Sequence, residues 1–171
     1  MHPQLTLVLG GARSGKSRYA ESLVTVTEPP WIYVATAQAL DREMTERIAH
    51  HRQRRGAGWR TIEEPNGIAD AIDAAPPGAM LVDCLTLWLT NRVLAEADIE
   101  AETGNLEAAL ARRGGLAVIV SNEVGSGIVP DNALARRFSD LQGWLNQRLA
   151  ARADRVVLVV AGLPLIIKAP A

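Results

Sequence analysis

The sequence is short of cysteine and has no excess of either charge, and each shortage excludes a class of protein. Its one cysteine, Cys84, cannot form an internal disulfide and has no Cys or His neighbours at metal-ligand spacing, so we expect it to be a buried packing residue. The 18 basic and 19 acidic residues leave a net charge of −1, without a long run of one sign. The sequence therefore gives no electrostatic reason to expect nucleic acid or a membrane surface as a partner.

Long apolar runs are missing as well. None approaches the roughly 18 to 20 residues of a membrane span, and the first residues lack a basic segment followed by an apolar one, so we expect a cytoplasmic protein. The length of 171 residues suits one domain, residues 1–171, and 48% hydrophobic with 22% charged residues is typical of a globular chain. Only two of the 18 basic residues are lysines, yet one of them, Lys16, lies inside a glycine-rich loop.

Short apolar runs alternate with helical patterns along the chain. The runs predict strands at residues 5–9, 31–36, 79–83, 116–121 and 156–160, with an edge strand at 59–63 and a last strand at 165–167. Helical spacing covers 17–26, 41–55 and the segment from 84 to about 113, and a long helix is marked by Leu134, Phe138, Leu141, Leu145 and Leu149. This alternation predicts a single-domain α/β fold, with a mostly parallel sheet and helices on both faces.

The glycine-rich loop connects the first predicted strand to the first predicted helix. Residues 10–17, GGARSGKS, match G-x-x-x-x-G-K-[ST] in the context that phosphate binding requires. The glycines let backbone N–H groups turn toward phosphate oxygens, Lys16 would reach the β and γ phosphates, and the Ser17 hydroxyl would hold Mg²⁺. The alternative, a tight turn that carries these residues by accident, is disfavoured by the strand-to-helix context.

Asp83 ends an apolar strand and is our candidate for the acid that orients the magnesium shell. It lies far along the chain from the phosphate loop, which suits a fold in which the two motif strands are adjacent in space only. Capping of the following helix is the other interpretation, and the two roles do not exclude each other.

His50 and His51 lie together in a basic helical segment. At about 100° per residue with Met44 as zero, His51 falls at about −20° and Arg55 at about +20°, whereas His50 falls at about −120°. His51 therefore faces the body of the protein, where nearby arginines would keep it neutral and hold a polyphosphate, so that it could attack phosphorus. From spacing alone, a solvated basic helix end whose cations favour the C-terminal dipole carries more weight.

A third polar cluster follows the strand at 116–121. Because carboxyl ends of parallel strands carry the ligand site, Asn122 and Glu123 would point into the same crevice as the phosphate loop. The alternative is a connector in which these two residues cap the next helix.

Together these motifs resemble those of the bifunctional adenosylcobinamide kinase and adenosylcobinamide-phosphate guanylyltransferase family of cobalamin biosynthesis. The resemblance covers almost the whole chain and rests on residues 10–21 (GGARSGKSRYAE), 33–36 (YVAT), 47–55, 59–63 (WRTIE), 82–86 (VDCLT), 122–130 (NEVGSGIVP) and 146–147 (NQ). It implies a P-loop NTPase-type, RecA-like fold and two reactions. ATP or GTP first phosphorylates the aminopropanol hydroxyl of adenosylcobinamide. A histidine then attacks the α-phosphorus of GTP, releases pyrophosphate and passes GMP to adenosylcobinamide phosphate.

The resemblance also implies partners and site residues. The partners are GTP, ATP and a corrinoid, without nucleic acid, and the assembly is a homotrimer. His51 matches the nucleophile, while Ser17 and Asp83 match metal-binding positions for Mg²⁺. The implied nucleotide-binding positions are Gly10, Gly11, Ala12, Arg13, Ser14, Gly15, Lys16, Ser17, Val34, Ala35, Thr36, Arg52, Gln53, Arg54, Arg55, Glu63 and Asp83.

Two other functions compete with this hypothesis. A simple small-molecule kinase would use the phosphate loop alone, and it would not release pyrophosphate through His51. A motor-like nucleotide module of the recombinase type would couple hydrolysis to a partner, but the sequence has no basic stripe for DNA and is short for extra modules.

Overall fold

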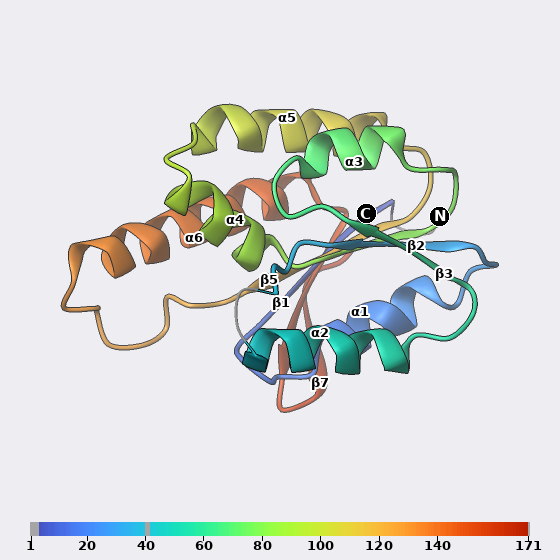
Figure 1. The fold of residues 1–171 in the computed structure, drawn as a ribbon, viewed down its shortest axis with the longest axis horizontal. Coiled ribbons are helices and arrows are strands. Elements are labelled where there is room, and N and C mark those ends of the chain that lie inside the picture. The colour runs from blue at the N-terminus through green and yellow to red at the C-terminus, as the bar shows by residue number, and fades with distance from the viewer. Residues whose placement is uncertain (1–3, 40–41, 171) are drawn as a thin grey trace.

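One seven-stranded sheet organises the computed structural model, which describes residues 4–39 and 42–170 except for the side chains of residues 47 and 54 (Figure 1). The strand order is β3-β2-β4-β5-β1-β6-β7, and every neighbouring pair is parallel except β6 and β7. The strands are β1 (Leu5–Gly10), β2 (Trp31–Ala35), β3 (Trp59–Glu63), β4 (Met80–Asp83), β5 (Ala117–Asn122), β6 (Arg155–Val160) and β7 (Leu163–Lys168). The predicted α/β class with a mostly parallel sheet is confirmed.

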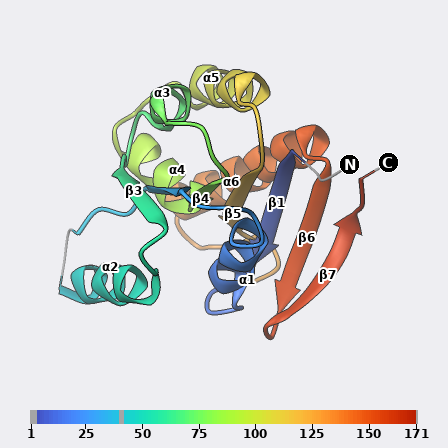
Figure 2. The same ribbon diagram turned by 90° about the vertical axis from the view of Figure 1, so that its right-hand side faces the viewer.

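Helices cover both faces of this sheet. Helices α3 to α6 lie on one face, and α1 and α2 lie on the other (Figures 1 and 2). Their bounds are α1 (Lys16–Val24), α2 (Arg42–Arg54), α3 (Ile68–Ala74), α4 (Leu85–Leu94), α5 (Ile99–Arg112) and α6 (Ala133–Arg152). Because both faces are covered, the central strands are buried on both sides, which explains their nearly continuous apolar sequences.

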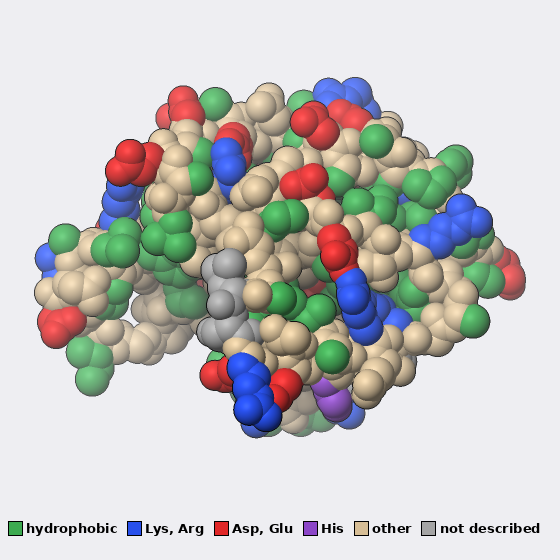
Figure 3. Space-filling model, in the orientation of Figure 1, with side chains coloured by type: hydrophobic (Ala, Val, Ile, Leu, Met, Phe, Trp, Pro, Cys, Tyr) green, Lys and Arg blue, Asp and Glu red, His purple; other side chains and the backbone are tan. Residues whose placement is uncertain are grey.

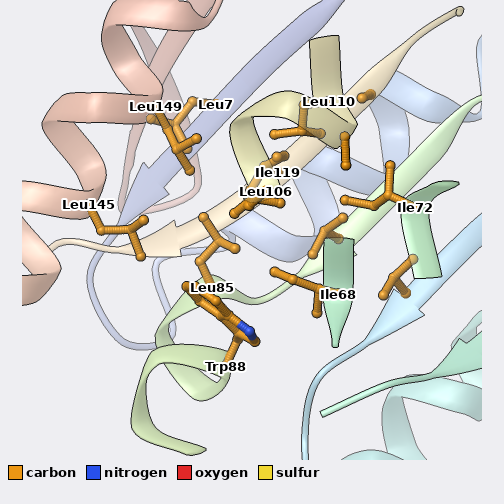
Figure 4. Packing of buried hydrophobic residues seen from close by; sticks show 14 of the residues in the cluster. Leu7, Ile68, Ile72, Leu85, Trp88, Leu106, Leu110, Ile119, Leu145 and Leu149 are labelled. Atoms are coloured by element: carbon orange, nitrogen blue, oxygen red, sulfur yellow. The ribbon is translucent and has the colours of Figure 1, made fainter. Parts of the chain in front are cut away.

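The larger hydrophobic core lies between the sheet and helices α3 to α6. Trp88, Leu106 and Leu145 come from three of these helices and pack over the strand residue Ile119, all at most 1% exposed (Figure 4). The apolar stripe predicted for the long helix is buried at Leu145 but is 55% exposed at Leu134. The first turns of α6 extend past the sheet, which agrees with the exposure of Leu134 (Figure 1).

Arginine side chains tie the outer helices to one another. Their forks bridge α4 to α5, α3 to α5 and α5 to α6, with N···O distances of 2.5 to 2.6 Å. The pairs are Arg92 with Glu102, Arg112 with Asp73, and Arg148 with Glu107. A planar guanidinium can offer two parallel N–H bonds to a carboxylate, as it does in each of these pairs, and an ammonium cannot.

Two features differ from the sequence-based prediction. The phosphate-loop strand β1 and the Asp83 strand β4 are not adjacent, because β5 lies between them. Helix α3 was not predicted; it has only seven residues, too few for a clear period. The helical patterns predicted from Asp83 to about Arg113 are confirmed as α4 and α5, and Asp98 caps the second by accepting a hydrogen bond from Ala101 N.

The turn between β6 and β7 touches the phosphate loop. Ala161 and Gly162 both have positive φ, 51° and 80°, as a tight two-residue hairpin turn requires. Gly162 N donates a hydrogen bond of 2.8 Å to Ser14 O. The last hairpin thereby fixes one side of the loop that follows β1.

The surface mixes charges of both signs. On the face shown in Figure 3, basic and acidic side chains are interspersed and form no stripe of one sign. No helix within residues 4–39 and 42–170 combines the length and the apolar character needed to cross a membrane.

Candidate functional site

A cavity of about 490 Å³ opens where strands β2 to β5 end. Ala35, Glu63, Asp83 and Asn122 are the last residues of these four strands, and all of them line it. The phosphate loop and the start of α1 contribute further lining residues, and α2 closes the opposite side. A cavity of this size is in the range of small-molecule sites, which extends from about 300 to 1,000 Å³.

The phosphate loop has the tight curl that its glycines predict. Gly15 has a φ of 92°, and a Cβ on Gly10 would lie 2.8 Å from Val159 O, so both positions require glycine. Lys16 Nζ donates a hydrogen bond of 3.0 Å to Gly11 O, which holds the ammonium over the loop. Ala12, Lys16 and Ser17 border the cavity. A polyphosphate on the loop would therefore meet a lysine, a hydroxyl and the N-terminus of α1.

The predicted magnesium ligands, Ser17 and Asp83, both line this cavity. A hydroxyl and a carboxylate are hard oxygen donors, which Mg²⁺ prefers. Among the described residues no three His, Cys, Asp or Glu side chains form a metal cluster. The donor set fits an ion that takes one or two protein oxygens and receives its remaining ligands from phosphates and water.

Tyr33 connects two predicted site residues, and sequence reasoning missed it. Its hydroxyl donates a hydrogen bond of 3.0 Å to Asp83 Oδ2, and Arg55 Cζ lies 3.5 Å from the centre of its ring. The ring is 4% exposed and meets Trp59 edge-on at 5.8 Å. Burial, together with the adjacent Asp83 charge, raises the pKa of Tyr33 well above its usual value, and Arg55 opposes this shift.

Helix α2 presents His51 to the cavity, as predicted from its angular position around the helix relative to Met44. Met44, Ile48, His51 and Arg55 all line the cavity, whereas His50 is exposed and outside the lining. The two imidazole rings are 6.4 Å apart and nearly perpendicular. His51 is therefore the histidine that could reach a bound nucleotide, and the frame that predicted this orientation is confirmed.

The other predicted nucleotide-binding residues differ in whether they line the cavity, are buried beside it or lie outside its lining. Arg52 and Glu63 border the cavity and form an ion pair with each other that joins α2 to β3. Val34 and Thr36 are fully buried, and the Thr36 hydroxyl is bonded to Cys84 O and Cys84 N instead of facing the cavity. Only their backbone groups could contact a nucleotide. The remaining predicted positions that do not line the cavity are Gly10, Gly11, Arg13, Ser14 and Gly15 in the loop and Gln53 on α2, while the Arg54 side chain lies outside the described residues.

Asn122 and Glu123 were both predicted to point into the crevice of the phosphate loop. At the end of β5 their side chains take different directions, and only Asn122 lines the cavity. Asn122 lines the cavity, and its Oδ1 is buried without a hydrogen-bond partner in the described structure. Glu123 turns back, and its carboxylate accepts a hydrogen bond of 2.8 Å from Gly125 N. The next helix is capped by Asn132 rather than by either residue. Asn122 is therefore a site residue, and Glu123 shapes the following turn.

A buried polar network holds the end of β5 in place. Asn146 on α6 accepts hydrogen bonds from Ser121 and Gln142 at 2.7 and 3.0 Å and donates one of 3.0 Å to Asn122 O. Gln142 and Asn146 are four residues apart, so they share one face of α6. Two polar residues at this spacing, each one position after a predicted core leucine, are the sequence signal that could have found the network.

Comparison with known proteins connects these features to a family. The family model described as cobinamide kinase / cobinamide phosphate guanyltransferase matches residues 6–167. The bifunctional adenosylcobalamin biosynthesis protein CobP of Pseudomonas aeruginosa is 50% identical over 167 residues, covering 95% of this chain and 96% of that protein. The bifunctional adenosylcobalamin biosynthesis protein CobU of Salmonella typhimurium is 46% identical over 181 residues, covering 96% and 99%.

Solved structures with little sequence identity share the fold. An ATPase from the type III secretion system of pathogenic bacteria is similar with a TM-score of 0.52 at 14% identity, over 95% of this chain and 56% of that one. A Pyrococcus horikoshii protein is similar with a TM-score of 0.50 at 12% identity, over 97% of this chain and 86% of that one. At such identities the likeness shows the fold alone, and it agrees with the predicted α/β architecture.

We predict that Asn146→Ala destabilises the protein by about 2–4 kcal/mol, because Ser121, Gln142 and the carbonyl of Asn122 each lose a buried hydrogen-bond partner. The measurement is the free energy of unfolding from urea denaturation. Asn105→Ala, at an exposed position of α5, is the matched control and should change stability by less than about 0.5 kcal/mol. Equal effects of the two substitutions would contradict a structural role for the network.

Proposed function

The chain belongs to the cobinamide kinase / cobinamide phosphate guanyltransferase family of cobalamin biosynthesis, and from this membership we propose that the cavity at the ends of β2 to β5 carries out both transfers on adenosylcobinamide. In the first, the terminal hydroxyl of the aminopropanol arm attacks the γ-phosphorus of ATP or GTP. The bond to the β-γ bridging oxygen breaks, the nucleoside diphosphate leaves, and the hydroxyl proton passes to solvent. The product is adenosylcobinamide phosphate.

In the second reaction His51 is the nucleophile. A neutral ring nitrogen attacks the α-phosphorus of GTP, the bond to the α-β bridging oxygen breaks, and pyrophosphate leaves. A phosphate oxygen of adenosylcobinamide phosphate then attacks the phosphorus of the histidine-linked GMP. The nitrogen–phosphorus bond breaks, His51 is released, and adenosylcobinamide-GDP is formed.

One observation carries this proposal: Lys16 of the phosphate loop and His51 of α2 line the same cavity. A triphosphate that rests on the loop would lie between them. Lys16 would neutralise the β and γ oxygens, which bear the charge of both leaving groups, the nucleoside diphosphate and pyrophosphate. Arg52 and Arg55, on the same side of the cavity as His51, are further cations for the phosphates.

Magnesium is part of the proposal, with Ser17 and Asp83 as its protein ligands. When bound, the ion would withdraw charge from the phosphate oxygens during transfer. The hard oxygen donors of these two side chains and their place beside the loop support this assignment. The chain itself supplies the lysine and arginine charges and the nucleophile.

The proposed assembly is a homotrimer, and the exposed apolar surface of β7 supports an oligomer. β7 is an edge strand, and Leu163, Leu165, Ile166 and Ile167 are each more than half exposed. Contiguous apolar residues on an unpaired strand edge are typical of a protein–protein contact.

We predict that His51→Ala abolishes covalent labelling by GTP carrying radioactive phosphorus at the α position, whereas His50→Ala keeps it. Of these two histidines, His51 lines the cavity and His50 does not, so His51 is the one placed to attack in line. The label on denatured wild-type protein should survive base and be lost in mild acid, as a phosphoramidate is. His51→Ala should still phosphorylate adenosylcobinamide. Labelling that persists in both variants would rule out a histidine intermediate and leave the simple kinase.

We predict that Lys16→Ala lowers both phosphorylation and guanylylation by at least about 100-fold, because both leaving groups lose the same neutralising charge. The two rates are followed by transfer of γ-labelled phosphate and by α-labelled GMP. Lys168→Ala is the matched control, since the only other lysine bonds to carbonyls at the end of α6. If Lys16→Ala lost only the kinase step, the second reaction would have to use a separate nucleotide site.

We predict that the protein sediments in ultracentrifugation with three times the chain mass of 18.4 kDa. Leu165→Glu should shift it toward the monomer, because a charge on the apolar strip of β7 would lose its solvation in a contact. Val26→Glu, at an exposed site on the α1 side, should leave the mass unchanged. A wild-type protein that sediments as a monomer would contradict the trimer.

A further inference from the structure

Tyr33 begins the YVAT segment of residues 33–36, but none of the roles assigned so far accounts for its side-chain contacts. It is the central residue of β2, paired in register with Thr61 of β3 and Leu81 of β4. A tyrosine in an apolar strand would ordinarily serve the core. This one directs its hydroxyl to the Asp83 carboxylate at 3.0 Å and offers its ring face to the Arg55 guanidinium at 3.5 Å.

The two contacts of Tyr33 lead to different parts of the site. Asp83 ends β4 beside the phosphate loop, where the proposed kinase step needs an oriented carboxylate. Arg55 follows α2 directly, four residues after His51, so it lies on the same side of the helix as the proposed nucleophile. Trp59 packs edge-on against the ring at 5.8 Å and limits its movement.

We propose that Tyr33 is a positioning residue that couples the two halves of the site. Its hydroxyl donates a hydrogen bond to Asp83 Oδ2 and so orients the carboxylate toward the phosphate loop. Its ring supports the Arg55 guanidinium and so fixes the end of α2 that carries His51 over the bound nucleotide. This inference rests on the proposed function. It adds a single residue that holds both the Asp83 carboxylate and the end of α2 in the positions that the two reactions need.

Two substitutions separate the two contacts. Tyr33→Phe removes the hydroxyl and keeps the ring, whereas Tyr33→Leu removes both. Tyr19→Phe is the matched control, because it removes the hydroxyl of the only other tyrosine, on α1 and outside the cavity lining. Denaturation curves show whether each variant is folded.

The hydroxyl is tested by calorimetric binding of GTP with and without Mg²⁺. The ratio of the two dissociation constants measures how strongly magnesium and nucleotide support each other's binding. In Tyr33→Phe this ratio should fall about tenfold, equivalent to about 1.4 kcal/mol, because Asp83 loses its orientation. In Tyr19→Phe it should match wild type. A ratio in folded Tyr33→Phe that stays within about twofold of wild type would overturn the role of the hydroxyl.

The ring is tested by the rate of GMP labelling at saturating Mg²⁺ and GTP. Tyr33→Leu should label about tenfold more slowly than Tyr33→Phe, because only Tyr33→Phe keeps the ring that contacts Arg55. Rapid labelling by folded Tyr33→Leu would overturn the role of the ring.

A double-variant cycle distinguishes action through Arg55 from a general loss of packing. If Tyr33 acts through Arg55, the variant with both Tyr33→Leu and Arg55→Met should label no more slowly than Arg55→Met alone. If the two substitutions lower the labelling rate multiplicatively, the proposal is overturned. It is also overturned if Tyr33→Leu does not fold and Tyr33→Phe leaves the ratio of the GTP dissociation constants with and without Mg²⁺ unchanged.

Failure of the proposed function gives a different result. Wild-type protein that takes up no GMP label would contradict the histidine intermediate. The magnesium ratio of Tyr33→Phe would still decide whether Tyr33 orients Asp83, because it is measured by binding and not by turnover.

Discussion

Parallel pairing sends the carboxyl ends of strands β1 to β5 to one edge of the sheet, and the rest of the site depends on this constraint. Each strand delivers one functional group there: the phosphate loop after β1, then Ala35, Glu63, Asp83 and Asn122. These residues are far apart in the sequence, yet the sheet fixes their spacing because hydrogen bonds hold neighbouring strands about 4.8 Å apart. His51 and Arg52 come from α2 and Arg55 follows it directly, and two contacts to the strands hold this segment in place: Arg52 with Glu63, and Arg55 with Tyr33.

The shortage of lysine has a counterpart in the helical layer. Three forked arginine–carboxylate pairs join α3, α4 and α6 to the central helix α5, and each uses two N–H groups of one guanidinium. Such pairs fix an angle as well as a distance, which a lysine cannot do. The pair of Arg148 with Glu107 is the least exposed on its acidic side, at 8%, so solvent screens it less than the others. Lysine is kept at Lys16, where a flexible stem with a compact charge suits a phosphate that changes position during transfer.

Local signals predicted the parts of the molecule that depend on neighbouring residues in the chain. The strand-loop-helix pattern at residues 10–17 placed the phosphate loop, and helical geometry chose His51 over His50, because both follow from fixed backbone periods. Strand order has no local signal, so the insertion of β5 between β1 and β4 was missed. Tyr33 and Gln142 were missed too, although the four-residue spacing of Gln142 and Asn146 is a local signal that the two share one face of α6. In the sequence they belong to an apolar strand and a helix, and their roles come from Asp83, 50 residues away, and from Ser121, 21 residues away.

The contact between Gly162 and Ser14 has a consequence for the order of events during synthesis. The ribosome makes the phosphate loop at residues 10–17 before the strands that surround it, because β1 pairs with β5 and β6, and the hairpin that supports the loop ends at Lys168. At the usual elongation rate of roughly 5–20 residues per second, the loop therefore waits on the order of ten seconds or more for its last neighbour. Its glycines leave it without a fixed shape during that time. The segment that begins the nucleotide site is thus completed only when β7 is in place, and a nascent chain cannot hold a nucleotide in finished form until that strand has emerged.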